Sequence, residues 1–494
     1  MKEDHLLSFE VNRQTIGKSA VSSVLFQLLI KLKGLITMPI LTMLMAPSEL
    51  GAYNLILVTS SVLTPIVTLN LTDGVGILFA QEKNVDTISK MFNTILNVIF
   101  ILTVCFYILA SLFYMFSSEY GSYVIWVSLL LLANITNKLP IFLLATYQKS
   151  GIILKNTFQK DIVITIATIA FVYFGYSYKG MVVSAFIVQM FFSAFLYRKI
   201  YSSIQYSFHI DKTILKHFLI MSLPLLPVFF FSWIVQSSDS YFLAYFSGQE
   251  TLGKYSVIYG ITNVILSITF ALNFFWFPVS ARLWVESREQ YMKIFKVVFV
   301  GMFAMLLTIV CLFELNSSTI MTIFVRRAAY YDAHVIMGTI AFAFAMQVLI
   351  TLLTAPLYSN RNTKAILFSY LVGGIINSIL NFILIPKIGI AGAAVSTAIA
   401  YFVIVVVMGF LNYRLAGFSF IDSRLKYLIP IYIAAWALMG WLRGYLTMPE
   451  IFIADVIFVT LVMASIYKQW MRNDERNYVS ALFMNFRMKQ TQGA

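Results

Sequence analysis

Charged residues are scarce in this sequence, and long polar stretches are missing from it. Only 11% of the 494 residues are charged and 60% are hydrophobic, whereas soluble domains carry about 25% charged residues. Apolar runs recur from end to end and leave no room for a sizeable soluble domain. The sequence therefore predicts an all-α polytopic membrane protein. Because Met1–Gln14 is polar with mixed charge, we expect no cleavable signal peptide.

Residues that build enzyme sites are also few. The two cysteines, Cys105 and Cys311, fall inside apolar runs and argue against a disulfide framework or a metal site. The four histidines show no ligand spacing, and the sequence has no phosphate-binding glycine loop. We therefore expect no catalytic residues, no bound metal and no ATP hydrolysis by this chain.

Apolar runs of about 18 residues or more predict fourteen membrane-spanning helices. Their expected limits are 17–45, 52–80, 92–116, 122–147, 160–177, 180–200, 218–246, 255–281, 294–315, 334–358, 365–385, 390–412, 426–443 and 449–469.

The basic residues test this count, because positive charge gathers in cytoplasmic loops. Of the 35 Lys and Arg residues, 26 fall in the two tails and one alternate set of loops, including Lys149, Lys155 and Lys160. Six fall in the other set of loops, and three lie inside helices. This split predicts that both termini are cytoplasmic. It also accounts for the net charge of +14 without a nucleic-acid partner.

Two short motifs recur at matching helices, as expected of transporters built from repeats. Leu50-Gly51-Ala52-Tyr53 opens the second predicted helix, and Leu252-Gly253-Lys254-Tyr255 opens the eighth. Gly180-Met181-Val182-Val183-Ser184 opens the sixth, and Gly392-Ala393-Ala394-Val395-Ser396 opens the twelfth. An offset of six helices predicts two six-helix bundles, residues 1–200 and 201–412. Two further helices and a cytoplasmic tail follow at 413–494.

The junction Ala46-Pro47-Ser48-Glu49-Leu50-Gly51-Ala52-Tyr53 resembles the LGPEEFGLY-type junction of polysaccharide exporters. These proteins belong to the multidrug/oligosaccharidyl-lipid/polysaccharide (MOP) superfamily, whose fold is MATE-like. The similarity extends to Leu252–Tyr255, to Pro278 and to the fourteen-helix layout, and so covers nearly the whole chain. Within the superfamily the sequence looks most like the Wzx-type flippases of O-antigen and capsule synthesis.

That resemblance implies a function. Such flippases move an undecaprenyl-diphosphate-linked oligosaccharide from the cytoplasmic to the periplasmic leaflet of the bacterial inner membrane by alternating access. It implies membrane lipids, a polysaccharide polymerase and chain-length proteins as partners, and a groove at helices thirteen and fourteen for the lipid tail. A lipid II flippase of the superfamily has arginines three residues before and three after a glycine in helix one. Lys31 matches the first relative to Gly34, but Thr37 occupies the second place.

Polar side chains inside the predicted helices form stripes, because residues three or four apart share a helix face. One stripe is Gln27, Lys31 and Gly34, with Lys33 about 200° round the helix from Lys31. The others are Asn70 with Asp73, Asn134 with Lys138, and Gln236 with Asp239. A diphosphate inside hydrocarbon needs a cation beside it. We therefore expect a cationic cavity lined by Lys31, Lys33, Lys138, Gln27 and Asn134.

The roles of several charges stay open at this point. Lys33 either faces the cavity or pairs with an acid in an adjoining helix. Asp73 and Asp239 either hold the lysines in the empty site or take up a proton or a sodium ion to couple transport. Asp161, Arg282 and Glu314 are expected at the membrane interface. Asn377 and Asn381 are expected to join helices through hydrogen bonds.

Two other functions compete with a flippase. A cation-coupled multidrug exporter of the same fold would favour an acidic cavity, whereas here three lysines face two mid-span aspartates. A membrane polymerase or ligase of lipid-linked sugars would be an enzyme with a large outward loop. The longest outward loop predicted here, Glu314 to Asp332, has fewer than twenty residues. The sequence therefore favours the flippase.

Overall fold

The computed structural model describes residues 33–72, 76–82, 84–116, 121–147, 149–417, 419, 422, 424–442, 445 and 448–465. A helical segment at Lys33–Leu44 comes first. The helices that follow are α2 (Pro47–Val67), α3 (Gly76–Gln81), α4 (Val85–Phe116), α5 (Gly121–Thr146), α6 (Ser150–Tyr173), α7 (Ser177–Ile200), α8 (Lys212–Ser222), η1 (Leu223–Leu225), α9 (Leu226–Thr262), η2 (Asn263–Leu266), α10 (Ser267–Ala271), η3 (Leu272–Trp276), α11 (Phe277–Glu286), α12 (Arg288–Leu315), α13 (Ser317–Phe324), η4 (Ala328–Ile336), α14 (Met337–Ser359), α15 (Thr363–Ala416), α16 (Leu425–Leu442) and α17 (Met448–Ser465).

Two of these elements are helical hairpins. α9 reverses at Gly248, where φ is +82°, and α15 reverses at Gly389, where φ is +55°. The Tyr259 hydroxyl donates to the Gln236 carbonyl at 2.9 Å across the first turn, as antiparallel arms require. With each arm counted separately, the described residues contain the fourteen passes that hydropathy predicted.

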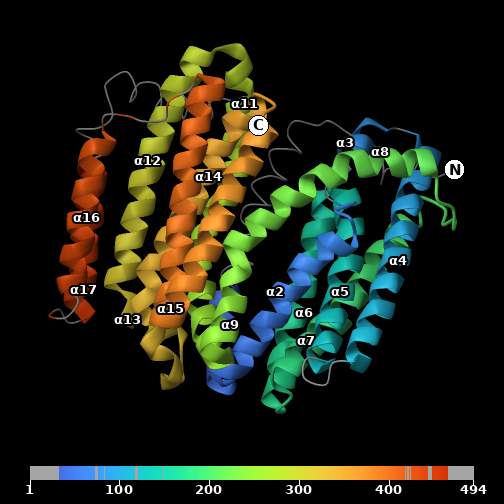
Figure 1. Cartoon of the computed structure of the whole chain (residues 1–494), viewed down its shortest axis with the longest axis horizontal. Helices are drawn as coiled ribbons and strands as arrows, with labels where there is room; N and C mark the ends of the chain where they lie inside the picture. The colour runs from blue at the N-terminus through green and yellow to red at the C-terminus, as the bar shows by residue number, and fades with distance from the viewer. Residues whose placement is uncertain are drawn as a thin grey trace, which may run out of the picture.

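The helices form two bundles with an addition at one edge (Figure 1). The N-terminal bundle contains α2, α4, α5, α6 and α7, and the C-terminal bundle contains α9, α12, α14 and α15. α16 and α17 pack against α12 at the outer edge of the C-terminal bundle. The segment Lys33–Leu44 packs its apolar side chains, among them Leu35, Met38 and Leu41, against the core of the C-terminal bundle. The predicted two-bundle fold with two extra helices is therefore confirmed.

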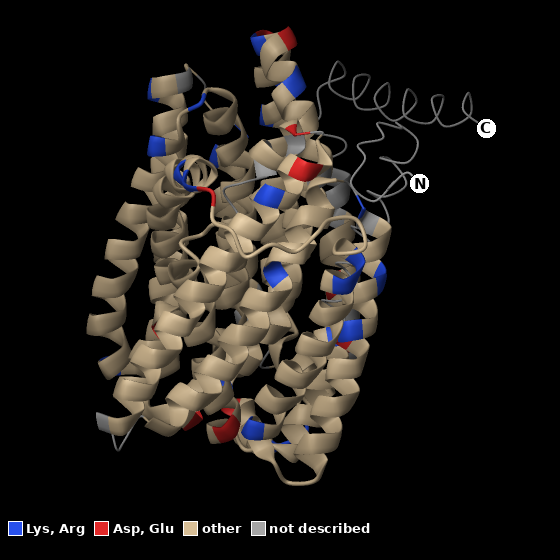
Figure 2. Cartoon of the chain, turned by 90° about the vertical axis from the view of Figure 1, so that its right-hand side faces the viewer, with Lys and Arg blue, Asp and Glu red and all other residues tan. Residues whose placement is uncertain are grey.

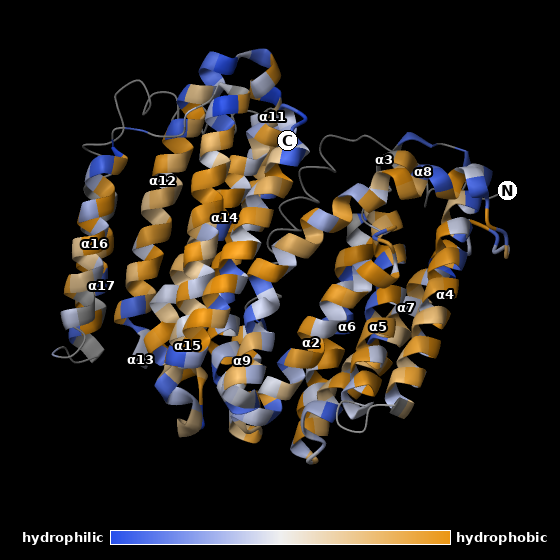
Figure 3. Ribbon diagram, in the orientation of Figure 1, coloured by the Kyte–Doolittle hydropathy of each residue, from blue (hydrophilic) through white to orange (hydrophobic). Residues whose placement is uncertain are grey.

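The outside of the bundles suits a bilayer. Eight described helical stretches are long and apolar enough to cross a membrane, and two of these are the hairpins. Large apolar side chains stay exposed along the perimeter, for example Leu109 on α4 and Ile433 on α16. Hydrophobic residues cover the middle of most helices, while hydrophilic residues gather toward the upper and lower ends (Figure 3). Lys and Arg also lie mostly in the upper half (Figure 2).

Several predicted boundaries were wrong. The second helix was expected to run from 52 to 80, but α2 ends at Val67. The fifth helix was expected to start at residue 160, but α6 begins at Ser150, so Lys155 and Lys160 belong to a helix and not to a loop. The polar run from Asn156 to Asp161 lowers the hydropathy and hides this half of the helix. α12 ends at Leu315 as predicted, and the expected outward loop from Glu314 to Asp332 contains the short helices α13 and η4.

The second repeat motif occupies equivalent places in the two bundles. Gly180 lies at the start of an arm that packs on the end of the preceding helix, and a Cβ built there would meet the Phe171 Cβ at 2.7 Å. Gly392 is placed in the same way, with the Leu384 carbonyl carbon 2.6 Å from a Cβ. Both glycines therefore permit the same close hairpin, one in each repeat.

Candidate functional site

The N-terminal bundle holds a lysine inside its polar core. Lys160 lies in the middle of α6 and is only 9% exposed. Its Nζ donates to the Asn137 Oδ1 of α5 at 3.5 Å, and the Asn137 amide donates in turn to the Ser193 Oγ of α7 at 3.0 Å. Three helices thus hold one buried cation. The sequence analysis placed Lys160 in a loop and therefore did not identify this buried cation.

Lys33 lies beside the same helix. Its Nζ is 4.0 Å from the Asp161 Oδ2, and the two side chains are 33% and 18% exposed. Of the two alternatives for Lys33, the structure therefore supports pairing with an acid in another helix. Asp161 was predicted to be interfacial, but it lies near the middle of α6 because that helix starts ten residues earlier than expected. We call Lys33, Lys160, Asp161, Asn137 and Ser193 the lysine cluster.

The other residues predicted to line the cavity are only partly described. Asn134 on α5 accepts a hydrogen bond at 3.2 Å from the Gln189 amide of α7. Lys138 follows one turn later on the same face of α5 and is half-buried. Gln27, Lys31 and Asp73 lie outside the described residues, so their roles stay predictions.

The C-terminal bundle buries an acid in place of a lysine. Asp239, in the first arm of α9, is 1% exposed. The Tyr255 hydroxyl from the second arm hydrogen-bonds to its Oδ2, and the Thr397 Oγ1 of α15 lies 3.4 Å from the same atom. Among the described residues, no lysine or arginine forms an ion pair with Asp239. The described residues therefore provide no lysine that Asp239 could hold in the empty site, as one of the two alternatives requires.

Amide side chains continue this polar region. Ser238 donates to the Asn377 Oδ1 at 3.0 Å, and the Asn381 amide donates to the same oxygen at 3.0 Å. The first of these bonds joins α9 to α15, as predicted for Asn377. Two buried atoms, the Asn377 Nδ2 and the Asn381 Oδ1, have no hydrogen-bond partner among the described residues. Since buried polar atoms are normally paired, this region, which we call the Asp239 cluster, has spare capacity for a polar ligand.

The two bundles touch where the first repeat motif meets its own copy. A Cβ built on Gly51 of α2 would lie 1.9 Å from the Gln249 carbonyl oxygen. A Cβ built on Gly253 of α9 would lie 1.7 Å from the Pro47 carbonyl oxygen. Pro47 precedes Gly51 by the same four residues that separate Gln249 from Gly253, so the contact is symmetric. Only a residue without a side chain permits this backbone approach.

Further bonds close the same end of the molecule. The Tyr330 hydroxyl of η4 donates to the Met45 carbonyl at 3.1 Å, and the Arg326 backbone N–H donates to the Thr42 Oγ1 at 3.2 Å. About two turns further along both helices, the Thr59 hydroxyl of α2 bonds to the Tyr241 hydroxyl of α9 at 2.7 Å. The bundles are therefore joined at the end that holds residues 42–51 and 249–253.

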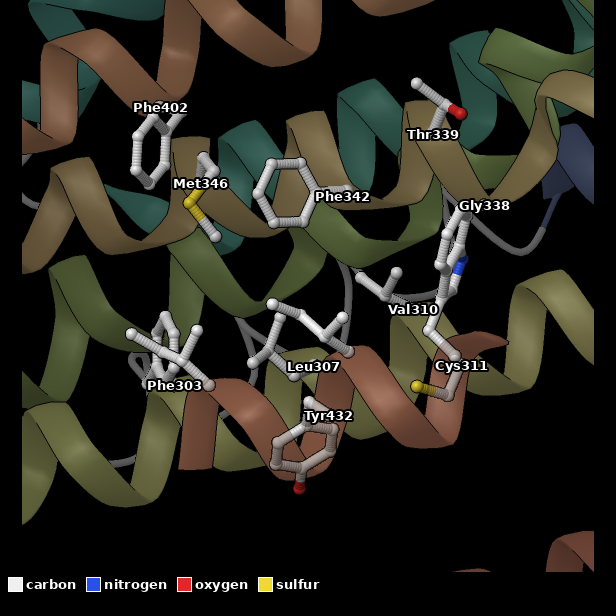
Figure 4. Close-up of a pocket in the computed structure, with 13 residues that line it drawn as sticks. Phe303, Leu307, Val310, Cys311, Gly338, Thr339, Phe342, Met346, Phe402 and Tyr432 are labelled. Carbon is white, nitrogen blue, oxygen red and sulfur yellow. The ribbon is translucent and has the colours of Figure 1, made fainter. Parts of the chain in front are cut away.

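An apolar pocket of about 480 Å³ lies between α16 and the C-terminal bundle. Phe342 and Met346 of α14 stand opposite Leu307 of α12 and Tyr432 of α16 (Figure 4). The Tyr432 hydroxyl is satisfied by the Ala304 carbonyl at 2.8 Å, so it presents its ring to the pocket. Such a lining suits a hydrocarbon chain.

More than half of the sequence matches a known protein family. Residues 16–284, more than half of the chain, match the family described as polysaccharide biosynthesis protein. The chain is also 25% identical over 233 residues to the Uncharacterized membrane protein MJ1068 of Methanocaldococcus jannaschii. That alignment covers 46% of this chain and 43% of the relative, so the chain spans less than half the length of that protein.

Structural comparison agrees with the fold. Lipid II flippase MurJ, in an inward closed conformation, gives a TM-score of 0.67 at 15% identity and covers 90% of this chain and 98% of its own. An inward-facing multidrug resistance MATE family transporter of the MOP superfamily gives a TM-score of 0.58 at 13% identity and covers 79% of this chain and 98% of its own. A MOP superfamily transporter from Pyrococcus furiosus gives 0.53 at 14% identity, with coverages of 84% and 99%. At such identities the likeness shows the fold alone, which is that of MOP transporters.

Proposed function

This chain belongs to the polysaccharide biosynthesis protein family, and on that premise we propose that it is a flippase for a polyprenyl-diphosphate-linked oligosaccharide. The observation that carries the proposal is the lysine cluster, a set of cations inside a helical bundle. Charged side chains within a membrane are costly and usually mark a transport pathway. A substrate with an anionic head group and a long apolar tail matches both the lysines and the apolar pocket.

The charges explain how a diphosphate would be carried. A diphosphate cannot enter hydrocarbon without compensation. Lysine offers a compact, mobile charge that can bind the phosphates and release them again. We propose that Lys31, Lys33 and Lys138 line the N-terminal side of a cavity between the bundles, and that Lys160 adds its charge from within the N-terminal bundle. The head group and sugars pass through this cavity while the tail stays in the bilayer.

The proposed direction follows from the charge distribution. Without Lys155 and Lys160, which lie in α6, 24 basic residues still fall in the predicted cytoplasmic tails and loops and at the helix ends beside them. We therefore propose that both termini are cytoplasmic and that the Gly51–Gly253 contact lies on the periplasmic side. Closure at that contact would leave the cavity open to the cytoplasm, the side from which the substrate is loaded. The substrate would be an O-antigen or capsule repeat unit in the bacterial inner membrane. A polymerase and chain-length proteins would act on it after release.

Coupling is assigned to the Asp239 cluster. A buried carboxyl group without a cation is expensive to keep charged. Near Asp239, the Asn377 Nδ2 and the Asn381 Oδ1 are buried without a hydrogen-bond partner among the described residues. We propose that a proton or a sodium ion binds at Asp239 and drives the change between the two facing states.

The pocket beside α16 is the proposed site of the polyprenyl tail, and filling it is a direct test. Val310→Trp should weaken binding of an undecaprenyl-linked substrate by about tenfold or more, since each buried CH₂ contributes about 0.8 kcal/mol and tenfold corresponds to about 1.4 kcal/mol. A farnesyl-linked analogue should bind the variant and the wild type equally in a titration of the purified protein. Ile431→Trp, at an exposed position of α16, is the matched control. If Val310→Trp lowered the affinity for both substrates equally, the polyprenyl tail would not bind in this pocket.

A cation-coupled multidrug exporter of the same fold is the competing function, and a membrane polymerase or ligase is the third. Asp239 alone would suit a cationic drug, but the lysine cluster would repel it. Depletion of the chain should cause lipid-linked oligosaccharide to accumulate and surface polysaccharide to disappear. Resistance to cationic drugs should stay unchanged. Altered drug resistance with normal surface polysaccharide would support the exporter instead.

A further inference from the structure

Lys160 is a buried cation without a carboxylate of its own. Its side chain is among the few charged groups of the described residues that are at least nine-tenths buried. Among the described residues, its hydrogen bond to a side chain is the 3.5 Å contact with Asn137. Within the part of the chain that the structure describes, no acid lies within ion-pair distance of its Nζ.

The neighbours of Lys160 are arranged to hold the charge and not to neutralise it. Because the Asn137 amide donates to Ser193, its oxygen is fixed toward the Lys160 Nζ. A single neutral acceptor compensates little of the cost of burying an ammonium group. The site is therefore built for an anion that these side chains do not supply.

One carboxylate stands near two lysines. Asp161 pairs with Lys33 at 4.0 Å, the upper limit of an ion pair. Both Asp161 and Lys33 are close enough to act electrostatically on Lys160. Two cations with one anion leave an excess of one positive charge in this part of the bundle.

We propose that Lys33, Lys160 and Asp161 form an anion-exchange site, in which Asp161 pairs with Lys33 in the empty protein and a diphosphate that contacts both lysines replaces it. This inference rests on the proposed function and names the residues that would hold the head group. A diphosphate diester carries two negative charges and balances both lysines once Asp161 has turned away. When Asp161 pairs with Lys33 again, it competes with the phosphates and assists their release.

Exchange and a purely structural ion pair predict opposite effects of removing the acid. If Asp161 only stabilises the fold, Asp161→Asn weakens the protein and does not improve binding. If Asp161 competes with the substrate, the same change removes a competitor and tightens binding. The sign of the effect therefore separates the two roles.

The test uses the full chain in lipid nanodiscs and farnesyl-diphospho-N-acetylglucosamine as the probe, with binding measured by titration calorimetry. Lys160→Met should weaken binding at least tenfold, as expected for loss of a hydrogen bond between charged groups. Lys160→Arg should stay within about threefold of the wild type. Asp161→Asn should bind about three- to tenfold more tightly. Lys155→Met changes an exposed lysine of the same helix and should have no effect.

The outcomes separate this inference from the proposed function. A wild-type chain that does not bind the probe contradicts the proposed substrate, and the exchange site falls with it. A wild-type chain that binds, with Asp161→Asn equal to or weaker than the wild type, overturns the exchange site alone. Thermal unfolding of each variant, with Lys160→Arg as the folded reference, distinguishes lost binding from lost structure.

Discussion

Replacing Gly253 with valine should abolish export, because the side chain would occupy the point where the two bundles touch. A Cβ at this position lies 1.7 Å from the Pro47 carbonyl oxygen, far inside contact distance, and the obstacle is backbone that cannot rotate away. Overpacking of this kind costs about 1–3 kcal/mol or more. The cheapest response is for α2 and α9 to separate. The variant should therefore lose the state in which this end is closed.

The measurement combines export with accessibility at the closed end. A cysteine placed at Ala52, which is 2% exposed in α2, in a chain without native cysteines should react with a membrane-impermeant maleimide faster in Gly253→Val than in the parent. Export of lipid-linked oligosaccharide should fall at least tenfold. Gly51→Val should behave in the same way, since the contact is symmetric. Gly301→Val in α12, where nothing lies within 4 Å of a Cβ, is the matched control. Full export in Gly253→Val would contradict a closing role for this contact.

Asp239→Asn is the second change with a large expected effect. The amide keeps the size of the side chain and can still accept hydrogen bonds from Tyr255 and Thr397. It cannot take up a proton, and it offers a sodium ion no charge. We therefore expect a folded protein whose flipping no longer responds to an ion gradient, with a rate at least tenfold below the wild type.

Proteoliposomes with an imposed proton or sodium gradient provide the assay for Asp239. The gradient that accelerates the wild type identifies the coupling ion, and Asp239→Glu should retain part of the response. Asp455→Asn is the matched control, because Asp455 on α17 is a second intramembrane acid whose Oδ2 already accepts from the Asn316 amide at 2.7 Å. Gradient-stimulated flipping by Asp239→Asn at the wild-type rate would exclude Asp239 as the coupling group.

Hydropathy predicted the fold well because membrane helices can be identified from the length and composition of apolar runs. The fourteen passes among the described residues were predicted, and the second repeat motif makes equivalent close contacts in the two bundles at Gly180 and Gly392. The sequence could not foresee that Gly51 and Gly253 face each other, since that contact depends on how two distant helices cross. Motif spacing shows that two segments are alike but says nothing about whether they touch.

The site was harder to predict than the fold, for a related reason. Lys33 was recognised as intramembrane, but its partner Asp161 was placed at a helix end because the polar half of α6 resembles a loop. Lys160 was missed by the same error. Asn137, which accepts the hydrogen bond from Lys160, was not predicted as a site residue, because a single asparagine forms no recognisable sequence pattern. A search for polar residues flanking an unusually short apolar run would have found this helix.

The leaflet that holds the lipid-linked repeat unit is the most direct measurement of the central claim. Cells depleted of this chain are treated with a membrane-impermeant glycosidase from the periplasmic side, and the protected fraction of the lipid-linked oligosaccharide is measured. A flippase predicts that the accumulated units are protected, because they remain in the cytoplasmic leaflet, and that re-expression makes them accessible. Units that are cleaved in depleted cells yet stay unpolymerised would contradict the account.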